Sequence, residues 1–296
     1  MQKLIEPIVY RGMTAKQVAE AYDDTISIPN LAILLQENRE RAKICKDKLN
    51  PINDVAYGSE PIQKLDIYAP NQEKNIPVLL DIHGGGWIYG SKNPRSIPAE
   101  AIMSQRVIWV TIDYGLFPKY RMEEIISHIR SAVAWIYKNI NQYGGNPNQL
   151  YISGQSSGAH LAATTLMEGW HNDFDVPEGV IKGLIALSGV YDLEGLVYAS
   201  KNEIQEMLRL TLEEARCVSP FYHLPKKVIP VIIAYGDKEP LAYVREAEDY
   251  TKALEAVGCN VTLIKVRNAN HFDMINAFSN HDESLFKTTM KMILNN

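Results

Sequence analysis

The stretch that most constrains this chain is the pentapeptide G-Q-S-S-G at residues 154–158. The apolar run 149–153 precedes it and reads as a buried strand, and residues 158–166 follow with apolar positions at helical spacing. Ser156 therefore lies at a strand–turn–helix junction, the context in which a G-x-S-x-G motif has chemical meaning. Such a turn lifts the serine hydroxyl clear of the backbone, near the positive end of the following helix. The motif makes Ser156 a candidate nucleophile.

Strand-like and helix-like segments alternate along most of the remaining chain. Strands are expected at residues 64–68, 77–82, 106–112, 149–153, 183–187, 228–235 and 261–266, and the longer helices at 122–140, 243–257 and 285–294. This alternation predicts an α/β fold, with a mostly parallel central sheet and helices on both faces. No linker, repeat or low-complexity tract divides the sequence, so we expect a single domain over residues 1–296.

Residues 1–55 are expected to form a helical extension that comes before the first strand. Thr14 and Gln17 have the spacing of a capping box for a short helix, and Pro29-Asn30 begins a second one. Two interpretations stay open. The extension either covers an edge of the sheet or forms a lid over an active site, where it would control the access of water and substrate.

Charge and composition argue against several classes of protein. The net charge of −5 argues against a nucleic-acid-binding surface. No apolar stretch approaches the roughly 20 residues of a membrane helix, and residues 1–12 lack the pattern of a signal peptide. Cys45, Cys217 and Cys259 are odd in number and widely spaced, which favours buried free thiols over disulfides or a metal site. We expect a cytoplasmic protein that binds neither nucleic acid nor membrane.

A second motif, H-G-G-G-W at residues 83–87, follows the strand expected at 77–82. Three successive glycines leave backbone N–H groups uncovered and able to face an anion. A flexible loop and a phosphate cradle are the alternatives, but the G-x-x-x-x-G-K-[ST] pattern of a phosphate loop is absent. The motif predicts an oxyanion hole for acyl transfer, with the backbone N–H groups of Gly85, Gly86 and Ser157 as donors.

A serine nucleophile needs a base, and His271 is the best candidate among the seven histidines. It stands just beyond the last strand, where a loop can reach back over the edge of the sheet. His83 precedes the glycines and is expected to hold their loop by a hydrogen bond, whereas His128 and His160 lie within helices. The remaining three lie in polar surroundings typical of the surface: His171, His223 and His281.

The acid that orients this base should follow the penultimate strand, in the order serine, acid, histidine. Two carboxylates occupy that loop, Asp237 and Glu239. Glu239 is farther from the strand end and free to turn inward, whereas Asp237 can bond the backbone of its own turn. Glu239 is the favoured acid and Asp237 stays the alternative. Either would fix the imidazole tautomer and stabilise the imidazolium.

Both motifs, together with H-F-D at residues 271–273, resemble those of the kynurenine formamidase (arylformamidase) family. These are α/β-hydrolases related to hormone-sensitive-lipase-like esterases, and the resemblance covers nearly the whole chain. It implies the α/β-hydrolase fold and a catalytic triad of Ser156, Glu239 and His271. The chain departs from the family pattern at Glu239, where aspartate is frequent, and at Gly86, where vertebrate-type formamidases tend to carry tyrosine.

The resemblance implies a serine hydrolase that cleaves small carboxylic esters or aryl amides, such as N-formylkynurenine, through an acyl-enzyme. No metal or organic cofactor is needed for this chemistry. The preference for esters or amides stays open, and a homodimer is one option for the assembly. The alternative function is a catalytically inactive α/β-hydrolase that serves as a small-ligand receptor. Dehalogenase or peroxidase chemistry is disfavoured, because serine rather than aspartate stands at the elbow.

Overall fold

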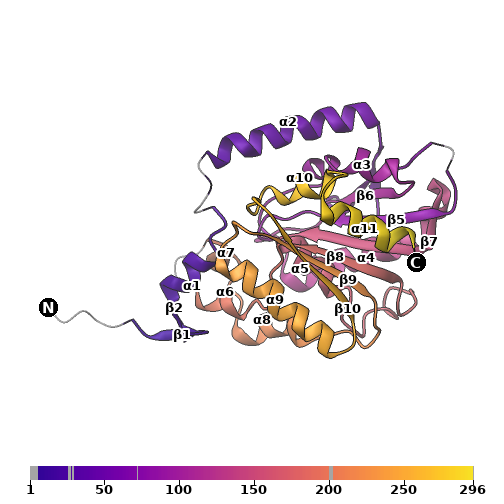
Figure 1. Ribbon diagram of the computed structural model, residues 1–296. Helices are drawn as coiled ribbons and strands as arrows, with labels where there is room; N and C mark the ends of the chain where they lie inside the picture. The colour runs from indigo at the N-terminus through magenta and orange to yellow at the C-terminus, as the bar shows by residue number, and fades with distance from the viewer. Residues whose placement is uncertain (1–5, 26–27, 29, 72, 200–202, 296) are drawn as a thin grey trace.

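The computed structural model describes residues 6–25, 28, 30–71, 73–199 and 203–295 (Figure 1). Its central feature is an eight-stranded sheet with the order β10-β9-β8-β7-β5-β6-β4-β3. The strands from β5 to β10 pair in parallel, while β4 is antiparallel to β6 and β3 antiparallel to β4. Their bounds are β3 Ile52–Ala56, β4 Lys64–Tyr68, β5 Ile76–Ile82, β6 Ile108–Ile112, β7 Gly145–Gln155, β8 Ile181–Leu187, β9 Pro230–Gly236 and β10 Asn260–Val266. The prediction of a mostly parallel α/β sheet is confirmed.

Helices cover both faces of this sheet. Side chains alternate across β5, so that Val78 and Leu80 enter one apolar core and Leu79 enters the other. The first core is shared with α4 (Met122–Asn139), α5 (Ser157–Thr164) and α9 (Leu241–Ala256), and the second with α3 (Ala99–Ser104), α10 (Met274–Ser279) and α11 (Ser284–Leu294). Because both faces are buried, the central strands read as near-continuous apolar runs.

The shorter elements lie between these layers or beside them. They are β1 Ile8–Tyr10, β2 Met13–Thr14, α1 Ala15–Ala21, α2 Leu31–Leu49, α6 Glu194–Tyr198, α7 Glu203–Leu208 and α8 Leu212–Val218, with the 3-10 turns η1 Asn93–Ser96, η2 Ile140–Tyr143 and η3 Pro220–Tyr222. Figure 1 shows α1 near α6 and α9, and α2 on the side of the sheet that carries α3 and α10.

The N-terminal extension is not purely helical, and that prediction is wrong in two respects: β1 and β2 precede α1, and β3 (Ile52–Ala56), which was not predicted, begins inside the extension. Strands β1 and β2 form a short antiparallel pair before α1, turning at Arg11 and Gly12, whose φ angles are 46° and 77°. Strands of three and two residues are too short to leave an alternating pattern in the sequence. The capping box of Thr14 and Gln17 is confirmed, and α2 begins after Asn30 as predicted; Pro29 lies outside the described residues.

All three cysteines are free thiols, as predicted, but only Cys259 is buried. Cys217 is exposed on α8 and Cys45 is half-buried on α2, so the expectation of burial is wrong for both. Free cysteine is usually buried, and composition cannot show which face of a helix it occupies. Among the helices of the described residues, none combines the length and apolarity needed to cross a lipid bilayer.

Candidate active site

The parallel strands direct the predicted site residues to one edge of the sheet. Ser156 directly follows β7, Glu239 lies three residues past β9, and His271 lies five residues past β10. The glycine loop, residues 83–87, begins where β5 ends. The carboxyl ends of parallel strands meet at the same edge, which is where α/β proteins place their ligands.

The turn at Ser156 has the backbone strain expected of a nucleophile elbow. Ser156 has φ 58° and ψ −127°, in a region that residues with a side chain rarely adopt. A Cβ on Gly154 would lie 2.2 Å from the carbonyl oxygen of Gly158, and one on Gly158 would lie 2.2 Å from that of Ile82. Neither backbone can move away, so both flanking positions require glycine. The turn therefore depends on the motif in which it was recognised.

The glycine loop lies directly against this elbow. A Cβ on Gly84 would lie 3.1 Å from the Ser156 Cβ, and Gly85 and Gly86 have φ angles of 121° and 60°. Within the described ranges, no backbone carbonyl accepts a hydrogen bond from the N–H groups of Gly85, Gly86 or Ser157. Three amide donors without a backbone acceptor, beside a serine hydroxyl, are what an oxyanion hole needs.

His83 supports the loop and does not face the nucleophile as a base. Its Nδ1 lies 2.7 Å from the Gly84 carbonyl oxygen, and its ring stacks on Tyr114 with the centroids 4.2 Å apart. The Tyr114 hydroxyl donates to the His83 carbonyl at 2.6 Å. Burial lowers the pKa of His83 to about 4, so its imidazole is neutral at physiological pH.

His271 packs into the site with Glu239 on its Nδ1. The distance from Nδ1 to Glu239 Oε2 is 3.3 Å, and the His271 side chain is only 4% exposed. Burial alone would lower the pKa of His271. The hydrogen bond and charge of Glu239, together with the charge of Asp24, outweigh this effect and raise the pKa above its usual value.

Glu239 and Asp237, the two candidate acids, have opposite environments. The Glu239 side chain is fully buried, and its Oε1 accepts hydrogen bonds from Ser188 Oγ at 2.5 Å and from the Gly236 N–H at 2.9 Å. Asp237 is exposed to solvent. The structure brings Glu239, not Asp237, to His271.

Tyr243 on α9 adjoins both Ser156 and His271. Its ring centroid lies 4.5 Å from that of His271. Burial raises the pKa of Tyr243 well above its usual value, the charges of Asp24 and Glu239 add to this, and a hydrogen bond with Ser156 acts in the opposite direction. In the sequence this residue reads only as one of the apolar positions of a helix, which gives no signal of a polar contact.

Asp24 is a second site residue that sequence reasoning missed. It lies in the turn after α1, and its Oδ2 is 3.4 Å from His271 Nε2. Burial raises the pKa of Asp24, while the charge of His271 acts to lower it. No motif marks this position, because the contact joins residues that are more than 240 positions apart in the sequence.

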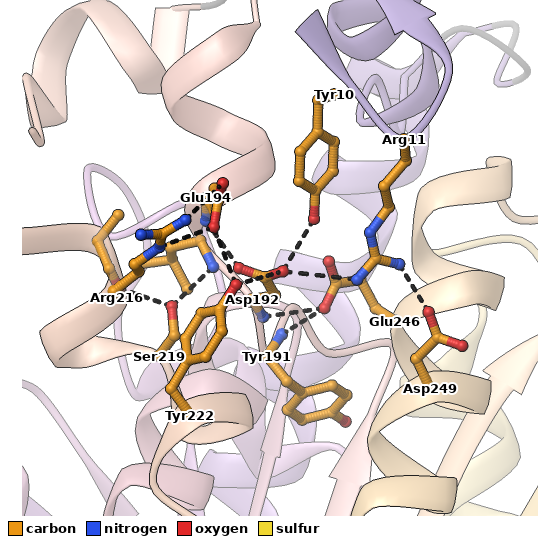
Figure 2. Close-up of polar contacts among 12 residues, drawn as sticks. Tyr10, Arg11, Tyr191, Asp192, Glu194, Arg216, Ser219, Tyr222, Glu246 and Asp249 are labelled. Atoms are coloured by element: carbon orange, nitrogen blue, oxygen red, sulfur yellow. Dashed lines mark hydrogen bonds and ion pairs between the residues drawn. The ribbon is translucent and has the colours of Figure 1, made fainter. Parts of the chain in front are cut away.

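The segment that carries Asp24, residues 8–24, is anchored on two acidic residues, the buried Asp192 and the partly exposed Asp249. Figure 2 shows Tyr10 and Arg11 lying above Asp192, with Arg11 also reaching Asp249. The Tyr10 hydroxyl donates to Asp192 Oδ2 at 2.9 Å, and the Arg11 guanidinium lies 3.5 Å from the same oxygen and 2.6 Å from Asp249 Oδ2. An arginine between two carboxylates fixes the start of the segment.

A third anchor lies at Tyr22, next to the turn that carries Asp24. The Tyr22 hydroxyl donates to Glu246 Oε1 at 2.8 Å, and Glu246 Oε2 accepts the backbone N–H groups of Tyr191 and Asp192. Burial raises the pKa of Glu246 to about 7. The segment is therefore held by buried polar contacts on both sides of α1.

The sequence is similar to a known family model and to several named enzymes. The family model BD-FAE matches residues 65–254. A kynurenine formamidase of Salmo salar is 31% identical over 267 residues, which cover 88% of this chain and 86% of the relative, and one of Danio rerio is 30% identical with the same coverage. The isoprenylcysteine alpha-carbonyl methylesterase ICME of Arabidopsis thaliana is 28% identical, over 74% of this chain and 56% of its own.

Solved structures support the fold. A Silicibacter protein, provisionally a thioesterase, superposes with a TM-score of 0.80 at 21% identity, covering 94% of this chain and 99% of its own. An esterase of Pyrobaculum calidifontis superposes with a TM-score of 0.70 at 16% identity, covering 90% and 94%. The family model and the formamidases do not favour an inactive receptor. The chain has the α/β-hydrolase fold, belongs to the BD-FAE and kynurenine formamidase family, and is a hydrolase of ester or amide bonds.

Proposed function

We propose that this protein is a serine hydrolase that cleaves small aryl amides and carboxylic esters, formamides such as N-formylkynurenine among them. The observation that carries the proposal is the contact between the buried Glu239 carboxylate and His271 Nδ1. This contact lies at the edge of the sheet where the Ser156 elbow lies. An imidazole held in this way presents Nε2 as the basic nitrogen, because Nδ1 carries the proton that faces Glu239.

In the proposed reaction, the Ser156 hydroxyl attacks the substrate carbonyl and its proton passes to His271 Nε2. The tetrahedral oxygen is stabilised by the backbone N–H groups of Gly85, Gly86 and Ser157. Each such donor contributes roughly 3–4 kcal/mol to the barrier reduction in comparable enzymes. The imidazolium then protonates the leaving amine or alcohol. Water, deprotonated by His271, releases the acyl group as a carboxylic acid and restores the serine.

We also propose that residues 1–296 form one domain and that residues 1–55 are an extension whose first part acts as a lid. The contact between Asp24 and His271 Nε2 supports this assignment, because Nε2 is the nitrogen that must take the proton of Ser156. Substrate binding would displace Asp24 from that nitrogen. The cytoplasmic location and the homodimer stay predictions, and light scattering on the purified protein measures the assembly directly.

The test compares kcat/KM on N-formylkynurenine with that on p-nitrophenyl acetate and butyrate, for the wild type and for Ser156→Ala. We expect turnover of both substrate classes by the wild type. Ser156→Ala should lose it by several orders of magnitude while its thermal melt stays close to the wild type. Turnover retained by Ser156→Ala would overturn the mechanism, and no turnover of any substrate by the wild type would favour the receptor.

A further inference from the structure

Gln155, the residue before the proposed nucleophile, connects the elbow to the histidine loop. It is the last residue of β7, and its side chain turns into the protein interior. Its Nε2 donates a hydrogen bond to the His271 backbone carbonyl at 2.7 Å, across 116 positions of sequence. His271 lies in the irregular stretch between β10 and α10, outside any strand or helix. The Gln155 bond therefore ties this loop to the strand that carries Ser156.

Arg95 fixes which way the Gln155 amide points. Its Nη1 donates to Gln155 Oε1 at 2.8 Å. Arginine has no hydrogen-bond acceptor, so the amide must turn its oxygen to Arg95, and its NH2 group then faces the His271 carbonyl. Arg95 belongs to η1, which follows the glycine loop in the chain. One amide thus joins the strand that leads to Ser156, the His271 loop and the η1 turn.

The charge of Arg95 is satisfied inside the core. Its Nε and Nη2 donate to the two oxygens of Asp81, at 2.5 and 3.0 Å, and Ser153 Oγ donates to Asp81 Oδ1 at 2.7 Å. Asp81 and Ser153 lie on the adjacent strands β5 and β7. A buried ion pair with its hydrogen bonds made is rigid, because moving either partner would leave an unpaired charge in the interior.

We propose that Gln155 and Arg95 are positioning residues of the hydrolytic reaction, which hold the His271 backbone in register with the Ser156 elbow. The inference rests on the proposed function, in which Ser156 is the nucleophile and His271 is the base. The need for such a tie is physical: a displacement of about 1 Å between reacting groups can lower a rate by about 100-fold. The imidazole must stay within reach of both Ser156 and Glu239. The loop that carries it belongs to no strand or helix, so the regular hydrogen bonds of secondary structure do not hold it in place.

The test uses two substitutions at Gln155. Gln155→Met removes both hydrogen bonds at similar size. Gln155→Glu still accepts from Arg95 but has no donor for the His271 carbonyl, so it isolates that single link. For both variants we expect kcat on p-nitrophenyl acetate to fall about 10- to 100-fold with KM within about twofold of the wild type.

The pH profile separates positioning from a loss of stability. Burial lowers the pKa of His271, whereas the hydrogen bond and charge of Glu239 and the charge of Asp24 raise it, so a loosened loop, which changes these contributions, should move the acid limb of kcat/KM. Thr289→Ala is the control, because it removes a buried hydrogen bond to the Leu285 carbonyl in α11. It should lower the melting temperature and leave kcat and the acid limb unchanged.

A kcat within about threefold of the wild type, with an unmoved acid limb, in either folded Gln155 variant would overturn the positioning role. That result would leave the proposed function intact as long as Ser156→Ala is inactive. Activity in Ser156→Ala would instead remove the proposed function, whatever the Gln155 variants do.

Discussion

Two carboxylates flank the ring of His271 at nearly equal distances, and they come from very different parts of the molecule. Glu239 lies 3.3 Å from Nδ1, and its side chain is fully buried. Asp24 lies 3.4 Å from Nε2, with a side chain that is 26% exposed. Glu239 comes from the loop after β9, whereas Asp24 comes from the N-terminal segment, residues 8–24. One carboxylate is therefore fixed in the protein interior, whereas the other lies at a partly exposed turn.

The comparison shows that the effect of a carboxylate on a catalytic histidine depends on which ring nitrogen it contacts. Glu239 faces the nitrogen that holds its proton throughout the proposed cycle, and Ser188 and Gly236 fix its orientation. Asp24 faces the nitrogen that must become free. With a carboxylate on each side, the imidazolium is stabilised at rest, and the pKa of His271 is raised. Glu239 therefore supports the proposed base, while Asp24 opposes the loss of its proton.

The largest effect is expected from breaking the Glu239 side. Glu239→Gln keeps the size of the side chain but removes the charge that stabilises the imidazolium, and its amide can turn an NH2 group towards Nδ1. The tautomer is then no longer fixed. A comparable change in a serine protease lowers kcat about 10⁴-fold, so we expect a fall of at least about 10³-fold on p-nitrophenyl acetate.

Asp237→Asn is the matched control for Glu239→Gln. Asp237 lies two positions earlier in the same loop and is exposed, so its kcat should stay within about twofold of the wild type, as for most surface changes. A larger loss at Asp237 than at Glu239 would move the acid to Asp237.

The Asp24 side should give a smaller effect of opposite sense. Asp24→Asn removes one of the charges that raise the pKa of His271, so the acid limb of kcat/KM should move to lower pH. At acid pH, a larger fraction of the His271 imidazole is then neutral in Asp24→Asn than in the wild type. Activity near pH 5 should therefore rise several-fold. At alkaline pH, where the imidazole is already neutral, the two enzymes should have similar rates. Stopped assays from pH 4.5 to 9 measure both regions.

Asp23→Asn controls for a general effect of charge. The Asp23 carboxylate bonds the backbone and side chain of Thr25, not His271. An equal displacement of the acid limb in Asp23→Asn would mean that the net charge of the turn, and not the contact with Nε2, sets the pKa of His271. An unmoved limb in Asp24→Asn would show that Asp24 leaves the ring in solution.

These two sides also differ in how far sequence could predict them. The elbow, the glycine loop and the order of serine, acid and histidine follow local patterns, because each residue stands at the end of an apolar strand. The buried environment of Glu239 comes from Ser188 and His271, which are distant in the sequence, so local pattern leaves the choice between Glu239 and Asp237 open. Asp24 and Arg95 have no such pattern, since each contributes through a partner distant in the sequence. The β1–β2 pair was missed for a related reason, because its strands are too short for periodicity to appear.

The anchor at Glu246 offers the finest test of the N-terminal side. The pKa of Glu246 is raised by burial to about 7 in the folded protein, while the hydrogen bonds from Tyr191 and Tyr22 act to lower it and the charge of Asp192 to raise it. In the unfolded chain a glutamate has a pKa of about 4.3. The folded state therefore binds this proton more tightly, so its stability should fall as the pH rises from about 4.5 to about 7 and then level off.

Glu246→Gln should remove this dependence, because an amide does not titrate. Its oxygen can accept the N–H groups of Tyr191 and Asp192 while its NH2 group faces the Tyr22 hydroxyl. From pH 5 to pH 8.5, the variant should gain stability relative to the wild type by an amount of the order of 3 kcal/mol, measured by urea unfolding at each pH. The neighbouring groups Arg11, Tyr10 and Asp192 are present in both proteins, so the difference between the two pH profiles reports on Glu246 together with its coupling to them. Because the anchor does not touch the Glu239 side, kcat at pH 8.5 should change by less than about twofold.

Two outcomes would contradict this account of the anchor. The same slope of unfolding free energy against pH in the two proteins would mean that Glu246 is ionised throughout, held so by its hydrogen bonds. A large loss of kcat would instead mean that the N-terminal segment supports the side of the ring that we assign to the core.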